Sequence, residues 1–140
     1  MNAIVVLSTG ISMDITNSAA RTNTGGSDRP NLIADATSGF TQSPRMWFNT
    51  AAFQLQPLYT FGNLGRNALH APGRKSLDLA IHREFRPTER LKAQFRFETF
   101  NATNTAPFAF PGLSFGASSF GVISSAGLPR NVQLALKLLF

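Results

Sequence analysis

The chain has 140 residues, which is room for one ordinary domain, and 14% of them are charged while 43% are apolar, too little charge for a small water-facing surface. The net charge of +6 leaves an acidic partner such as nucleic acid or anionic lipid open. The absence of cysteine excludes disulfides, thiolate zinc sites and cysteine nucleophiles.

The N-terminal segment combines a β-rich stretch with no targeting signal. Residues 3–7 are all apolar and mostly β-branched, so we expect a strand near residues 3–12. This apolar run is far shorter than the roughly 20 residues of a membrane-spanning helix. The first basic residue is Arg21, so any secretory signal peptide is expected to lie upstream of Met1.

Residues 16–73 are dominated by Asn, Thr, Ser, Gly and Pro, with turn signals at 25–30 and 62–65. The composition predicts a long loop with local structure. A loop of this length is uncommon inside a compact domain of this size. We therefore expect the segment to belong to a larger protein or to be disordered.

Two strands joined by a short turn are predicted next, near residues 76–85 and 91–100. In both segments apolar residues alternate with polar ones, which is the period of a strand with two different faces. A five-residue turn at 86–90 makes the two strands a hairpin. In the register that this turn implies, Phe85 pairs with Leu91.

A second long loop, near residues 101–130, leads to the clearest strand, near 131–140. If residues 131–140 formed a helix, the apolar residues of this segment would be spread over several sides, so an alternation of period two fits the sequence better than the helical period of 3.6 residues. These apolar residues are Val132, Leu134, Leu136, Leu138 and Phe140.

The other side of these three strands is polar. In the expected register Arg96 lies opposite Ala80, Glu84 beside Lys92, and Asp78 faces Glu98 as in an ion-pair ladder. The candidate residues of this face are Asp78, His82, Glu84, Lys92, Gln94, Arg96, Glu98, Gln133 and Lys137.

The strands are about 9 to 11 residues long, the length of a tilted strand that crosses a bilayer. A soluble antiparallel sheet with one face on a core shows the same alternation. Two features favour the membrane: the connections alternate long, short, long, and nothing else in the chain is expected to cover the apolar face. Arg83, near the turn, can extend to lipid headgroups, whereas Trp47 and Tyr59, in the first loop, do not form the expected aromatic girdle.

Several short segments, in conserved order along the chain, resemble the C-terminal end of TonB-dependent outer-membrane receptors of the Oar-like group, which carry a carboxypeptidase-regulatory-like domain. They are 28–32 (DRPNL), 47–49 (WFN), 51–53 (AAF), 61–67 (FGNLGRN), 77–79 (LDL), 89–90 (ER), 94–96 (QFR), 120–123 (FGVI), 129–130 (PR) and 133–137 (QLALK). The fold class that follows is all-β: an antiparallel meander of about four strands, a C-terminal fragment of a large transmembrane β-barrel with long external loops.

The resemblance also implies a location and partners. The chain is expected in the bacterial outer membrane, where Phe140 and the alternate apolar residues before it, Val132, Leu134, Leu136 and Leu138, are the signal for the barrel-assembly machinery. The other expected partners are outer-membrane lipid, the remainder of the receptor barrel with its plug, TonB through an N-terminal region absent here, and an unidentified bulky solute. No nucleic acid is expected, because the phenylalanines of the second hairpin strand face away from its cations.

No constellation for catalysis, a cofactor or a metal is apparent, so we expect no enzyme. Residues 73–76 (GRKS) lack the glycine directly before lysine that a phosphate loop needs. Neither His70 nor His82 has a second histidine at metal-ligand spacing. The alternative function is a soluble, basic, β-rich binding or structural module.

Overall fold

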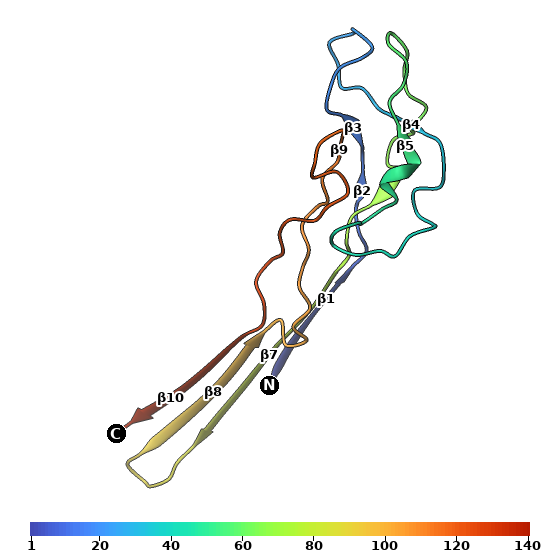
Figure 1. The fold of residues 1–140 in the computed structure, drawn as a ribbon. Helices are drawn as coiled ribbons and strands as arrows, with labels where there is room; N and C mark the ends of the chain where they lie inside the picture. The colour runs from blue at the N-terminus through green and yellow to red at the C-terminus, as the bar shows by residue number, and fades with distance from the viewer. The chain divides into compact units, whose positions relative to one another are not determined.

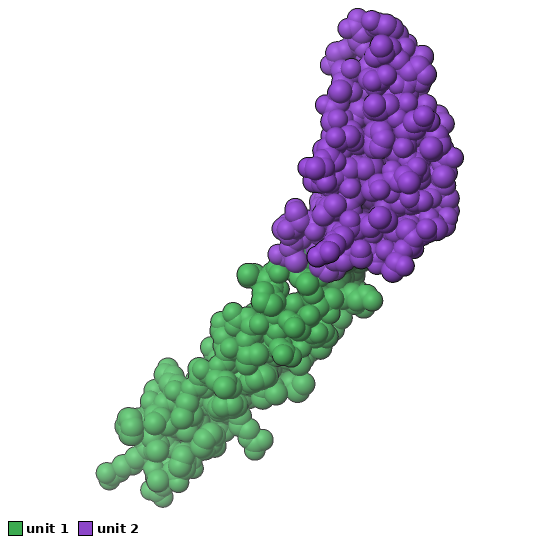
Figure 2. All heavy atoms as spheres, in the orientation of Figure 1, with its two compact units in different colours: residues 1–9, 73–107, 127–140 green, residues 10–72, 108–126 purple.

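A computed structural model describes all 140 residues. The chain divides into two compact units (Figure 2). Unit 1 comprises residues 1–9, 73–107 and 127–140, and unit 2 comprises residues 10–72 and 108–126. Each unit is therefore assembled from segments that are far apart in the sequence.

Unit 1 is a four-stranded antiparallel sheet with the order β1-β7-β8-β10 (Figure 1). Its strands are β1 (Asn2–Ser8), β7 (Arg74–Phe85), β8 (Lys92–Phe100) and β10 (Asn131–Leu139). Each long strand pairs with the next long strand along the chain, which confirms the all-β antiparallel meander. None of the helices in the structure has the length and hydrophobicity needed to cross a membrane.

The first strand is shorter than predicted: β1 ends at Ser8. Two residues later the chain passes tightly against another segment of unit 2, since a Cβ built on Gly10 would lie 1.6 Å from the carbonyl oxygen of Ala71. Only glycine permits this approach, and the pairing of β1 with β7 ends just before it, at Ser8 and Arg74. β7 begins at Arg74, two residues earlier than predicted, since Arg74 already pairs with Ser8.

The predicted register of the hairpin is wrong by two residues. Phe85 pairs with Ala93 and not with Leu91, so the connection between β7 and β8 is 86–91 and includes Leu91 as well as the predicted 86–90. The alternation of apolar and polar residues does not determine the length of the turn, so it leaves the register open by steps of two residues. A shift of two residues keeps every side chain on its face, so the two faces remain as predicted.

The apolar face of the sheet is continuous across all four strands. In the register of the structure Leu134 lies opposite Phe97, and Leu136 opposite Phe95. We define this apolar face by Ala3, Val5 and Leu7 of β1, Leu77, Leu79, Ile81 and Phe85 of β7, Ala93, Phe95, Phe97 and Thr99 of β8, and Val132, Leu134, Leu136 and Leu138 of β10. Val5, Leu134 and Leu136 are each more than 60% exposed, which is far above the exposure of a soluble core.

Unit 2 contains most of the two predicted long loops, and the first of them has the local structure expected of it. Short strands pair β2 (Ser12–Met13) with β6 (Leu69–His70), β3 (Thr16–Asn17) with β9 (Ser114–Phe115) in parallel, and β4 (Asn31–Leu32) with β5 (Phe53–Gln54). One 3-10 turn, η1 (Thr50–Ala52), is capped by the side chain of Asn49. The buried core residues are Met13, Ile15, Ala36, Phe48, Ala52, Phe53, Leu64, Leu69 and Ala71.

An aromatic cluster joins the two predicted loops within unit 2. Phe48 and Phe53 come from the first loop, and Phe115 and Phe120 from the second. The ring centroids of neighbouring members lie 5.1 to 6.3 Å apart, mostly edge to face. Each such pair contributes about 0.5–1.5 kcal/mol beyond its area burial. The two loops therefore fold as one body.

Candidate functional site

The polar face of the sheet is the main candidate site. The structure places all nine predicted residues on unit 1, on the side opposite the apolar face. The face is less polar on β1, where Ile4 and Val6 point to the same side as Asp78 and Ser76. We use "polar face" for Asp78, Ala80, His82 and Glu84 of β7, Lys92, Gln94, Arg96 and Glu98 of β8, and Gln133, Ala135 and Lys137 of β10.

Three residues near the turn end of the polar face form a hydrogen-bonded group. Gln94 Nε2 donates to Glu84 Oε1 at 3.2 Å and also contacts His82 Nε2. His82 Nε2 lies 3.8 Å from the same carboxylate oxygen. Glu84 therefore pairs with Gln94, and not with Lys92 as expected, because the register is shifted by two residues.

The next pair towards the loop end is an ion pair within one strand. Arg96 Nε lies 3.7 Å from Glu98 Oε1. Arg96 is opposite His82 and Glu98 is opposite Ala80, so the predicted Arg96–Ala80 pairing and the facing of Asp78 and Glu98 are both wrong by the same shift. The Arg96 side chain is 52% exposed, and a pair this accessible contributes about 0–1 kcal/mol.

Asp78 has a structural contact that sequence reasoning missed. Its Oδ1 accepts a hydrogen bond from the backbone N–H of Asn101 at 2.8 Å, directly after the last residue of β8. Asn101 has a positive φ of 52°, a conformation that asparagine tolerates. Its side chain in turn binds the backbone of Thr105 and, at 3.4 Å, the carbonyl oxygen of Leu128. The sequence signal for this contact is an asparagine directly after a predicted strand, since asparagine accepts the positive φ of a turn.

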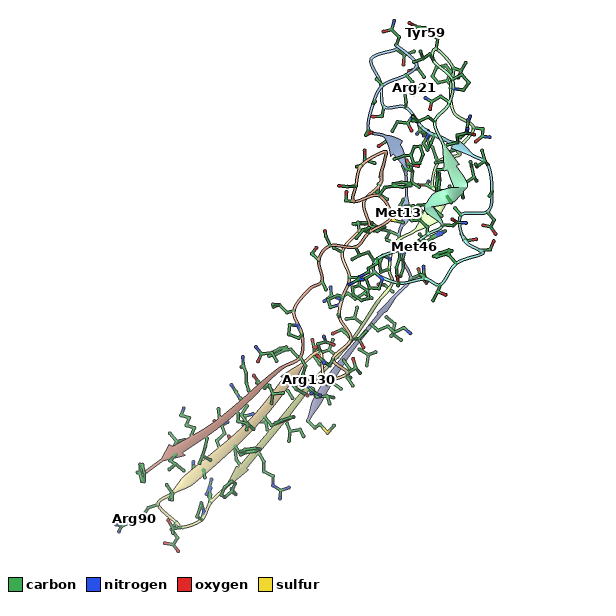
Figure 3. The ribbon with its side chains drawn as sticks, in the orientation of Figure 1. Met13, Arg21, Met46, Tyr59, Arg90 and Arg130 are labelled. Carbon is green, nitrogen blue, oxygen red and sulfur yellow. The ribbon has the colours of Figure 1, made fainter.

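An open groove lies beside this turn, at the end of the sheet where the long loops begin. Its volume is about 620 Å³. Among its lining residues are Arg74, Ser76, Asp78, Asn101, Thr105 and Asn131. Arg130 is found at this end of the sheet and Arg90 at the opposite end, in the turn between β7 and β8 (Figure 3). The groove offers hydrogen-bonding groups and two cations, Arg74 and Lys75, and on its wall Ser76 Oγ donates to Asp78 Oδ1 at 3.4 Å.

The proposed assembly-signal residues share one face of β10. Val132, Leu134, Leu136 and Leu138 lie opposite Thr99, Phe97, Phe95 and Ala93 of β8. Phe140 follows the last residue of β10 and is 97% exposed. Recognition of these residues by an assembly machinery remains a prediction.

Histidines and acidic residues do not gather elsewhere. No group of three or more His, Asp or Glu side chains is arranged to hold a metal ion. His82 has Glu84 as its single acidic neighbour, and His70 lies in the other unit, where its carbonyl oxygen accepts from the indole N–H of Trp47 at 2.9 Å.

The most strongly bound carboxylate lies in unit 2. Asp28 is 5% exposed and accepts from Thr22 Oγ1 at 2.5 Å, from the N–H of Arg21 and from the N–H of Thr22 at 2.8 Å. These donors, the Thr22 hydroxyl first, lower the pKa of Asp28. Asp28 thereby closes the loop 21–28, and all of its partners are structural.

Searches of curated protein sequences and of solved structures found no match to this chain. A protein-family model described as an outer membrane beta barrel domain matches residues 1–133. The match supports an outer-membrane barrel over a soluble module and agrees with the exposed apolar face of the sheet. The chain thus belongs to the outer membrane beta barrel domain family and is an outer-membrane protein.

Proposed function

We propose that the chain forms part of the barrel wall of a TonB-dependent receptor of the Oar-like group, which takes up a bulky solute with energy relayed by TonB. Family membership supports the outer-membrane barrel, and the resemblance of ten short segments supports the receptor group. In this role the chain supplies wall, lumen lining and loops, and it has no catalytic residue and no cofactor.

The observation that carries the proposal is the charge on the polar face. Arg96 and Glu84 lie along the sheet with side chains 52% and 71% exposed. The interior of a small barrel is filled by packed side chains, whereas large outer-membrane transporters, with about 22 strands, surround a plugged lumen. A charged and accessible face suits a wide lumen that contains water or the polar surface of a plug.

Both edge strands of the sheet need further strands to pair with. β1 and β10 each have one neighbour, so each has an unpaired edge. Within a bilayer every unpaired backbone group costs several kcal/mol, and only a closed barrel removes such edges. The proposal therefore includes barrel strands from other parts of the receptor on both sides, together with its plug.

The chain order gives the sheet two different ends. The segments 9–73 and 101–130 leave one end, and the short connection 86–91 lies at the other. Outer-membrane barrels have short periplasmic turns and longer extracellular loops. We assign the aromatic-centred unit 2 to the cell exterior and Arg90 to the periplasm, so that the groove beside Asn101 opens at the outer mouth, where a solute first arrives.

Conductance and TonB binding together test the proposal on the full-length receptor. A plugged receptor inserted in a planar bilayer is expected to give no steady current, and to bind the purified periplasmic domain of TonB. A large steady conductance without TonB binding would identify an open diffusion channel and overturn the receptor assignment, while leaving the outer-membrane barrel intact.

A further inference from the structure

The apolar face carries two charged side chains, and both are cations. Lys75 lies opposite Leu7 of β1, and Arg83 lies opposite Phe95 of β8. The four acidic residues of unit 1 are all elsewhere: Asp78, Glu84 and Glu98 are on the polar face, and Glu89 is in the turn. The two cations therefore have no counter-charge on their own side of the sheet.

Neither cation is neutralised by reaching around the sheet. The ion pairs of the structure are His82–Glu84 and Arg96–Glu98, both on the polar face. Arg83 and Lys75 are both exposed. An unpaired charge against hydrocarbon is costly, so a long cationic side chain near a strand end extends to the headgroup region.

The spacing of the two cations matches the height of an apolar band. Arg83 follows Lys75 by eight residues on β7, with Leu77, Leu79 and Ile81 between them on the same face. Eight residues of strand extend about 27 Å, which for a strand tilted by 35–45° is about 20 Å along the membrane normal. The apolar band of such barrels is about 25 Å tall, so the two side chains need to cover only the remaining few ångströms.

We propose that Lys75 and Arg83 bind phosphate groups of lipid headgroups, one in each leaflet, and so fix the depth of the sheet in the outer membrane. Arg83 binds phosphate in the leaflet at the turn end of the sheet. Its planar guanidinium can bind two phosphate oxygens at once. Lys75 serves the leaflet at the loop end, where it also borders the groove, and binds as a point charge.

Lipid selectivity of the full-length protein tests the proposal. The protein is placed in phosphatidylcholine vesicles, and the association of spin-labelled phosphatidylglycerol is measured relative to spin-labelled phosphatidylcholine. One cation near the membrane surface corresponds to about a fivefold preference for anionic lipid. We expect Arg83→Gln and Lys75→Gln each to lower the relative association constant by about this factor, and Arg83→Lys to retain it.

The matched control is Arg96→Gln, which removes a cation from the same hairpin on the polar face. It is expected to leave the lipid preference unchanged. The proposal is overturned if Arg83→Gln keeps the wild-type preference or if Arg96→Gln loses as much. Should Arg83→Gln fail to assemble, Arg83→Met, which suits an apolar face, replaces it in the comparison with Arg83→Lys, and an equal preference for these two variants would also overturn the proposal.

Discussion

Replacing Leu134 by arginine tests the assignment of the two faces energetically. Leu134 lies next to the middle of β10, on the apolar face opposite Phe97. An arginine facing lipid costs about 2–4 kcal/mol near the bilayer midplane and about 0–1 kcal/mol at the interface. We therefore expect Leu134→Arg to lower the free energy of unfolding by about 2–4 kcal/mol, a change of roughly 30- to 900-fold in the folding equilibrium.

The matched control is Gln133→Arg, one residue away on the polar face and opposite Glu98. Its arginine meets water and a carboxylate, so the expected change is below about 1 kcal/mol in either direction. Both values come from denaturant titration of the full-length protein in phospholipid vesicles, followed by circular dichroism. Equal losses for the two variants would refute the opposite roles of the faces.

Three further predictions concern the core of unit 2, its pH response and barrel assembly. Phe53→Ala is expected to lower the free energy of unfolding by about 3–5 kcal/mol, because Phe53 is 5% exposed and contacts three other rings. The control Phe61→Ala, at a side chain that is 79% exposed, is expected to lower it by less than about 0.5 kcal/mol. The fluorescence of Trp47, the one tryptophan, measures unfolding of both variants. The pKa of Asp28 is lowered from 3.8 in the folded state, so the stabilising contribution of this carboxylate is complete above the unfolded pKa and is lost as the pH falls through the folded pKa. Asp28→Asn should flatten the acid dependence of the free energy of unfolding below the unfolded pKa, and an unchanged profile would contradict this prediction. Deleting Phe140 is expected to reduce the amount of folded protein in isolated outer membranes, and an undiminished amount would remove this residue from the assembly signal.

The strands of unit 1 were predictable because period-two alternation runs through three of them, with Lys75 and Arg83 of β7 as the charged exceptions on the apolar face. The same alternation assigned all nine predicted residues to the polar side of the sheet. The register was not predictable to better than two residues, since a shift of two leaves both faces intact and the length of the turn around Pro87 is not encoded by the pattern. Only pairing partners such as Glu84 and Gln94 depend on it.

The fold of unit 2 could not be read from the sequence. Its core is built from isolated apolar residues, such as Ile15, Phe48 and Leu64, that follow no period. Its strands are two residues long and pair segments from both loops, as β3 and β9 do. Such contacts have high sequence separation and leave no local signal. The composition correctly indicated turns, but it could not predict that Phe53 and Phe120 pack against each other.

Alternating water access along β10 is the most direct test of the central claim that the sheet separates lipid from a polar lumen. The chain has no cysteine, so single cysteines can be placed one at a time from 132 to 138 in the full-length protein in intact outer membranes. A small, charged, water-soluble thiol reagent is expected to label cysteines at Gln133, Ala135 and Lys137, and to leave those at Leu134, Leu136 and Leu138 unlabelled. Uniform labelling, or labelling that repeats every three to four residues, would contradict the account.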